Sequence, residues 1–253
     1  MLQGVLLWGY GIVAAAGLVA GSFLNVVVYR YLSGESIVRP ASHCPSCLVP
    51  LSAKDLVPLL SYLLLRGRCR HCRTGIPLRY PLMEAGTAGI FLLCFHHYTF
   101  TPAFLQFAVL FSLLLVISVI DLERHLIPNR LVLLLLGWVI LWQLFFPRIS
   151  TLSALGGFFT GGFLFLAIAL LSKGGMGGGD VKLMAVLGLA SGLPDVLLVF
   201  MLAFFSGALV GVLLIIFKQK TRKSPLPFGP FLSLAFLGTT FWGPCIWDGY
   251  FLV

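Results

Sequence analysis

Two aspartates, Asp121 and Asp180, occupy positions where a carboxylate needs a functional reason. Asp121 closes the apolar run 113–120, and Asp180 follows three glycines and opens another apolar segment. A carboxylate at membrane depth is costly and marks a candidate functional site. Two neighbouring carboxylates do not both ionise readily, so one acts as base on a water while the other donates to a carbonyl oxygen. The pair therefore predicts aspartyl-protease chemistry.

The same residues allow two other interpretations. In one, Asp180 is the N-cap of a helix, and Asp121 pairs with Arg124 or Lys182. In the other, both carboxylates bind protons or cations in a transporter. No further acidic residue lies in mid-span to continue a relay, which speaks against transport. The protease interpretation also explains glycines 177–179, because residues without a side chain would let an extended substrate backbone approach closely.

Four of the six cysteines form two C-x-x-C pairs, with 21 residues between the pairs. Two such pairs supply four thiolates from two tight turns, which is the ligand set of a tetrahedral zinc site. Because four thiolates leave no open position, the zinc would be structural rather than catalytic. The alternative is a set of reduced, metal-free cysteines. The predicted ligands are Cys44, Cys47, Cys69 and Cys72.

The amino-acid composition indicates which class of protein carries these aspartates and cysteines. The 253 residues are 59% hydrophobic and only 10% charged. Soluble domains contain about 25% charged residues, and the 22 phenylalanines exclude a disordered chain. We therefore predict an all-α polytopic membrane protein. Its net charge of +9 then reflects membrane topology, not nucleic acid binding.

Charge-free runs divide the chain into about eight transmembrane helices. Residues 1–29 carry no charge, and about 20 apolar residues suffice for one span. A soluble, zinc-binding insert follows at 30–79, and about seven further helices form a transmembrane peptidase domain at 80–253. The expected spans are 1–29, 80–97, 103–121, 130–146, 151–172, 181–193, 196–217 and 228–246.

The basic residues predict the orientation of these spans. With eight helices, 16 of the 17 Lys and Arg residues lie on one side, and only Arg148 lies on the other. Because basic residues accumulate on the cytoplasmic side, the insert and both aspartates are expected at the cytoplasmic face. The side with 16 positive charges includes the loop residues Lys173, Lys218, Lys220, Arg222 and Lys223.

Seven motifs follow one another along nearly the whole chain. They are GSFLNVVVYR at 21–30, CPSC at 44–47, DLVPLLS at 55–61, RGRCRHC at 66–72, RYPLME at 79–84, DLERHLIPN at 121–129 and GGGDVKL at 177–183. With these motifs the chain resembles the type IV prepilin peptidases. These are bifunctional leader peptidases and N-methyltransferases of bacterial pilus, type II secretion and competence systems.

The resemblance implies that Asp121 and Asp180 are the catalytic pair of a GxGD-type aspartyl protease. It also implies a prepilin or pseudopilin substrate, cut at the cytoplasmic face of the bacterial inner membrane. The new N-terminal residue is then methylated from S-adenosylmethionine. Glu84 is the candidate for the methyltransferase site, and its alternative role is pairing with Arg79. Membrane lipid is the other expected partner, and a non-enzymatic assembly protein or a transporter is the rival function.

Overall fold

The computed structural model describes residues 2–39, 41–172, 175–217 and 226–251, and within these ranges side chains from residue 7 to 249. Across the described residues the chain is helical, without a β-strand. The predicted all-α class is therefore confirmed. Five basic residues behind the predicted orientation lie outside the described residues, namely Lys173, Lys218, Lys220, Arg222 and Lys223.

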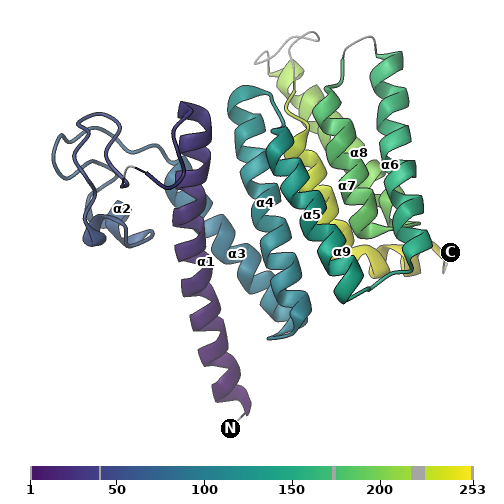
Figure 1. Ribbon diagram of the computed structural model, residues 1–253, viewed down its shortest axis with the longest axis horizontal. Coiled ribbons are helices and arrows are strands. Elements are labelled where there is room, and N and C mark those ends of the chain that lie inside the picture. Colours follow the sequence, from purple (N-terminus) through teal and green to yellow (C-terminus); the bar gives the residue numbers. More distant parts are fainter. Residues whose placement is uncertain (1, 40, 173–174, 218–225, 252–253) are drawn as a thin grey trace. The chain divides into compact units, whose positions relative to one another are not determined.

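Eight long helices form in the described chain where the charge-free runs predict them (Figure 1). They are α1 (Leu2–Ser33), α3 (Arg79–Tyr98), α4 (Pro102–Arg124), α5 (Asn129–Phe145), α6 (Thr151–Leu171), α7 (Gly178–Ser191), α8 (Asp195–Ile216) and α9 (Gly229–Phe251). The insert adds a 3-10 helix, η1 (Ala53–Asp55), and the short α2 (Leu60–Leu64).

Four of the described helices are long and apolar enough to cross a membrane, namely α1 over Leu7–Ser33, α4, α6 and α8. By contrast, α7 has 14 residues and is only about 21 Å long, shorter than the roughly 30 Å hydrocarbon core of a bilayer. Its residues 183–189 are all buried. Protein, rather than lipid, therefore surrounds this short helix.

The chain forms two compact units, residues 1–112 and 113–253. In the first unit α1 packs against α3, and the insert connects them (Figure 1). An added Cβ at Gly21 would lie 2.7 Å from Cα of Glu84, so a glycine permits this close helix contact. The boundaries predicted from the sequence lie at residues 29 and 79, according to the expected membrane topology. The two compact units instead meet between residues 112 and 113, because they are defined by packing.

In the second unit α7 is central, since it contacts α5, α6, α8 and α9. The crossing of α6 and α7 is especially close. An added Cβ at Gly157 would contact the carbonyl oxygen of Gly188, and one at Gly188 would contact the carbonyl oxygen of Gly157. Glycine at both positions is thus what allows α7, which carries Asp180, to sit among its neighbours.

We expect Gly188→Val to destabilise the protein by about 2 kcal/mol or more, because overpacking of this crossing forces the backbones apart. The measurement is the thermal midpoint of the purified protein in detergent. Gly137→Val in α5 is the matched control, because an added Cβ there meets nothing within 4 Å. Equal midpoints for the two variants would contradict the close crossing.

Candidate functional site

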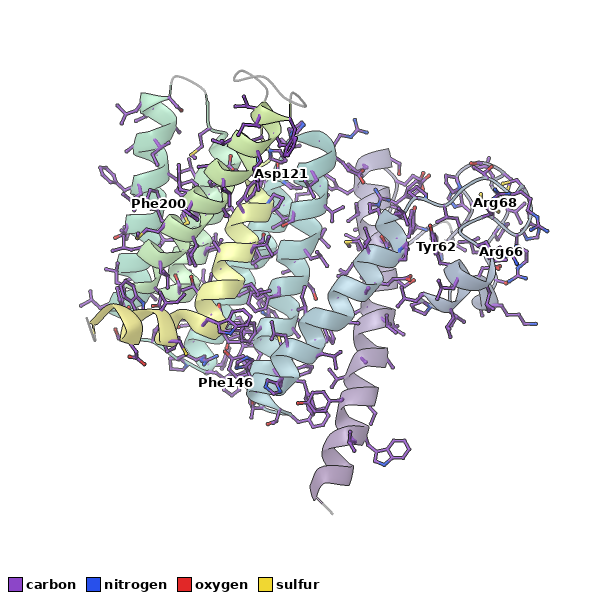
Figure 2. All side chains as sticks on the ribbon, turned by 180° about the vertical axis from the view of Figure 1, so that it is seen from behind. Tyr62, Arg66, Arg68, Asp121, Phe146 and Phe200 are labelled. Carbon is purple, nitrogen blue, oxygen red and sulfur yellow. The ribbon has the colours of Figure 1, made fainter. Side chains whose placement is uncertain are left out.

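Asp121 lies in the last turn of α4 and is only 4% exposed. Its Oδ2 accepts a hydrogen bond from the backbone N–H of Gly229, the first residue of α9, at 2.8 Å. An added Cβ at Gly229 would lie 2.9 Å from the same oxygen, so glycine is needed beside this carboxylate. Figure 2 shows Asp121 where α9 begins. The start of α9 therefore orients the Asp121 side chain.

Asp180 lies in the first turn of α7 and is half-buried. Its Oδ2 accepts from the N–H of Gly177 at 3.2 Å, so Gly177, not Asp180, is the N-cap. An added Cβ at Gly179 would lie 2.8 Å from Cβ of Ile127, whereas one at Gly178 meets nothing within 4 Å. Gly179 thus admits the chain's own α4–α5 connection, and only Gly178 leaves space for another molecule.

The α4–α5 connection brings the two aspartates to the same end of the second unit. Besides the contact of Ile127 with α7, the Nζ of Lys182 donates to Oδ1 of Asn129 at 3.0 Å. Lys182 therefore contacts Asn129 instead of Asp121. The structural interpretation paired Asp121 with Arg124 or Lys182, and the Lys182 pairing is not formed.

Polar contacts behind Asp121 hold α4 and α9 together. The Ser118 hydroxyl lies 2.9 Å from that of Ser233, which donates to the carbonyl of Gly229 at 2.9 Å. Phe228, just before α9, packs its ring 5.2 Å from that of Phe204 in α8. These contacts fix the backbone at Gly229, and through it the position of the Asp121 carboxylate.

The four cysteines meet in one cluster within the first unit. All four sulfur atoms lie within 4.8 Å of one another, and the sulfurs of Cys44 and Cys72 are 3.8 Å apart. Tetrahedral bonds of about 2.3 Å between zinc and sulfur require sulfur separations of about 3.8 Å. The donor set and its spacing therefore fit a zinc ion.

The two C-x-x-C segments fold into the same turn. The N–H of Leu48 donates to the carbonyl of Cys44 at 2.8 Å, and the N–H of Arg73 donates to that of Cys69 at 3.1 Å. Leu48 and Arg73, each following the second cysteine of its pair, have φ values of 58° and 61°. This left-handed backbone costs a non-glycine residue about 1–2 kcal/mol. A shared metal would hold both turns in this conformation.

Hydrogen bonds in the insert shift the pKa values of its titratable groups. The hydrogen bond with Thr74 lowers the pKa of Cys72 to about 6, whereas, against a lowering backbone hydrogen bond from Val49, burial and the hydrogen bond with Cys44 raise the pKa of Cys47 to about 11. Asp55 accepts from the Ser52 hydroxyl at 2.6 Å and from Nε of Arg70 at 2.7 Å. These bonds lower the pKa of Asp55 to about 2. Asp55 therefore ties η1 to the second cysteine turn.

Glu84 lies at the junction between α3 and the insert and is 8% exposed. Its Oε2 accepts from the backbone N–H of Leu59 at 2.8 Å. Glu84 also lines a cavity of about 180 Å³ between α1, the insert and α3. This candidate residue thus belongs to the first unit with the cysteines, whereas both aspartates belong to the second.

Two residues of these sites were missed by sequence reasoning, Gly229 and Asn25. Gly229 stands between Pro227 and Pro230, near the start of the span predicted at 228–246. Asn25 lies in the charge-free part of α1 and is 2% exposed. The signal that could have found it is the position of a polar residue within an apolar span.

Family models match both parts of the chain. The model of the bacterial peptidase A24 N-terminal domain matches residues 15–98, and that of the type IV leader peptidase family matches residues 108–212. A prepilin leader peptidase/N-methyltransferase of Bacillus subtilis (strain 168) is 34% identical, over 92% of this chain and 94% of the relative. The chain belongs to the type IV leader peptidase family. It is therefore an enzyme, and the family resemblance read from its motifs is confirmed.

Other relatives of this leader peptidase carry the same name, prepilin leader peptidase/N-methyltransferase. The protein of Aeromonas salmonicida (strain A449) is 34% identical, covering 95% of this chain and 93% of its own. That of Burkholderia pseudomallei (strain 1026b) is 37% identical, covering 90% and 83%. No solved structure matches the chain.

Proposed function

We propose that this leader peptidase removes the leader of type IV prepilins or pseudopilins and then N-methylates the new N-terminal residue. The observation that carries the peptidase assignment is the placement of Asp121 and Asp180 at one end of the second unit, where Gly179 of α7 contacts Ile127 of the α4–α5 connection. The names of the relatives support the substrate class and the second activity.

In the proposed peptidase reaction, Asp121 and Asp180 share one proton. The ionised carboxylate takes a proton from a water, which attacks the scissile carbonyl, while the protonated partner donates to the carbonyl oxygen. Gly229 holds Asp121 in one orientation through its N–H. The open space beside Gly178 is where an extended substrate backbone would pass.

The proposed topology places this reaction at the cytoplasmic face of the bacterial inner membrane. Eight spans would put 16 of 17 basic residues on that side. In this topology 1–29 is the first span, 30–79 is the cytoplasmic zinc-binding insert, and 80–253 holds the remaining spans of the peptidase domain. Zinc bound by the four cysteines would stabilise the insert without taking part in peptide cleavage.

The direct test incubates the purified protein with a prepilin, with and without S-adenosylmethionine, and reads the products by mass spectrometry. We expect cleaved pilin in both reactions, and cleaved pilin heavier by one methyl group only with the methyl donor. An intact prepilin in both reactions would contradict the proposed function, and ion flux in liposomes without any cleavage would favour a transporter.

We propose that Glu84 serves the methyltransferase activity, so Glu84→Gln should reduce methylation at least about tenfold more than cleavage, the cost of losing one charged acceptor. The two activities need different groups, because methyl transfer requires a bound donor and a neutral amine, whereas hydrolysis requires two carboxylates. One incubation read by mass spectrometry measures both. Equal losses of cleavage and methylation would instead indicate a structural role for Glu84 at the junction of α3 and the insert.

A further inference from the structure

The short helix α2 of the insert has two sides of different character. Leu60, Leu63 and Leu64 are 58%, 68% and 82% exposed, and their spacing of three and four residues places them on one side of the helix. Ser61 and Leu65 instead line the cavity between α1, the insert and α3. We call Leu60, Leu63 and Leu64 the leucine surface. Adjacent exposed leucines mark a site of interaction with a protein or a membrane.

Two contacts fix the level of α2 along α1. The backbone N–H of Leu59, the residue before α2, donates to Oε2 of Glu84 at 2.8 Å. Glu84 in turn packs on α1, because an added Cβ at Gly21 would lie 2.7 Å from Cα of Glu84. Gly21 precedes Arg30, the first charged side chain of the sequence, by nine residues, which is roughly 13 Å along a helix. The start of α2 therefore lies beside the charge-free part of α1, not beyond its charged end.

This level lies within a candidate membrane span. Residues Leu7–Ser33 of α1 are long and apolar enough to cross a membrane, and Gly21 falls inside this range. Figures 1 and 2 both show α2 level with the body of α1, between the two ends of that helix. A chain that crosses the membrane through α1 thus carries α2 at the depth of the lipid, where its exposed leucines meet the bilayer.

Basic residues border the leucine surface. Lys54, Arg66 and Arg68 are all exposed and stand within six residues of α2. The insert at 30–79 holds eight Lys and Arg residues but only two acidic residues. Leucines flanked by basic residues are typical of segments that lie in the membrane interface, where the cations meet anionic lipid headgroups. A second copy of the chain would bring the same positive charges, so charge disfavours self-association through this surface.

We propose that the leucine surface is an interfacial membrane anchor, with its three side chains in the acyl region and the flanking basic residues at anionic lipid headgroups. Its partner is the bilayer that α1 crosses. Because α2 has only five residues, it depends on α1 and α3 to hold it at this depth. The anchor fixes the insert, with its cysteine cluster, against the membrane surface.

The test measures the depth of residue 64 in full-length protein reconstituted into vesicles of phosphatidylcholine and phosphatidylglycerol. An environment-sensitive fluorescent amino acid replaces Leu64 in one variant and Val38 in the control. Val38 is also 82% exposed, but it follows Ile37, whose carbonyl accepts from Arg30 at the charged end of α1. Bromine atoms on the lipid acyl chains should quench the fluorescence at position 64 about twofold or more and leave position 38 nearly unchanged.

Three results of this measurement would overturn the anchor. The first is no quenching at position 64, or equal quenching at both positions. The second is a fluorescence change at position 64 only at high ratios of protein to lipid, which would assign the leucine surface to a second copy of the chain. The third is a change only after a prepilin is added, which would assign the surface to the substrate.

Amide hydrogen exchange in the same vesicles gives a second measurement. The double variant Leu63→Gln, Leu64→Gln removes most of the leucine surface, and we expect amides 60–65 to exchange about tenfold faster or more than in the unmodified protein. Val38→Gln is the control and should leave these amides unchanged. Unaltered exchange in a double variant with a normal thermal midpoint would contradict the anchor. Neither measurement uses cleavage or methylation, so failure of the proposed function would leave this test intact.

Discussion

We expect Asp121→Asn and Asp180→Asn each to reduce prepilin cleavage by about a hundredfold to ten-thousandfold, the range that general acid–base catalysis contributes. An amide can neither take a proton from water nor share one with the other aspartate. The variants should remain folded, because an Asn side-chain oxygen can still accept the N–H of Gly229 or Gly177 that each carboxylate accepts now. Cleavage rates and thermal midpoints of the same preparations test both parts.

Asp195→Asn provides the matched control for these two variants. Asp195 is also an acidic residue in the first turn of a helix of the second unit, and its carboxylate accepts from Nε1 of Trp247 at 2.8 Å. Its loss should leave cleavage near the level of the unmodified protein. Near-normal turnover of either Asp121→Asn or Asp180→Asn would show that the pair is not catalytic. A reaction by water attack also forms no acyl-enzyme, so serine-directed reagents should have no effect.

Removal of the metal has the second largest expected effect. We expect one zinc ion per chain by elemental analysis, and a protease-resistant insert that becomes readily cleaved after chelation or in Cys69→Ser. The physical reason is that both cysteine turns contain a left-handed residue, Leu48 and Arg73, and the insert has few buried side chains. A bound zinc would then supply most of its stability, since structural zinc contributes on the order of 10 kcal/mol in small domains. Limited proteolysis, with fragments identified by mass, reports the change.

Cys245→Ser serves as the control for the zinc experiment, because Cys245 is an exposed cysteine outside the cluster. It should leave both the zinc content and the proteolysis pattern unchanged. Because Cys44 and Cys69 line the cavity, we expect chelation to weaken methylation more than cleavage. Carefully purified protein without zinc would show that the four cysteines are held together by protein contacts alone.

The sequence by itself determined the features that depend on short stretches of chain. Apolar runs with few charges located the eight long helices of the described chain, because a helix that crosses a bilayer needs about 20 predominantly apolar residues. The two C-x-x-C pairs indicated the cysteine cluster, since each pair forms within one turn. The position of Asp180 near the start of a helix followed from the glycines before it.

Only the tertiary structure decided the contacts between distant segments. Asp121 meets Gly229 across 108 residues, and Asn25 meets Tyr80 across 55; no local pattern encodes either pair. The span predicted at 181–193 is the shortest of the eight, yet α7, which forms there, is the central helix of its unit, because Gly157 and Gly188 let α6 approach it. Such contacts depend on how surfaces of several helices fit together, which a hydropathy pattern does not record.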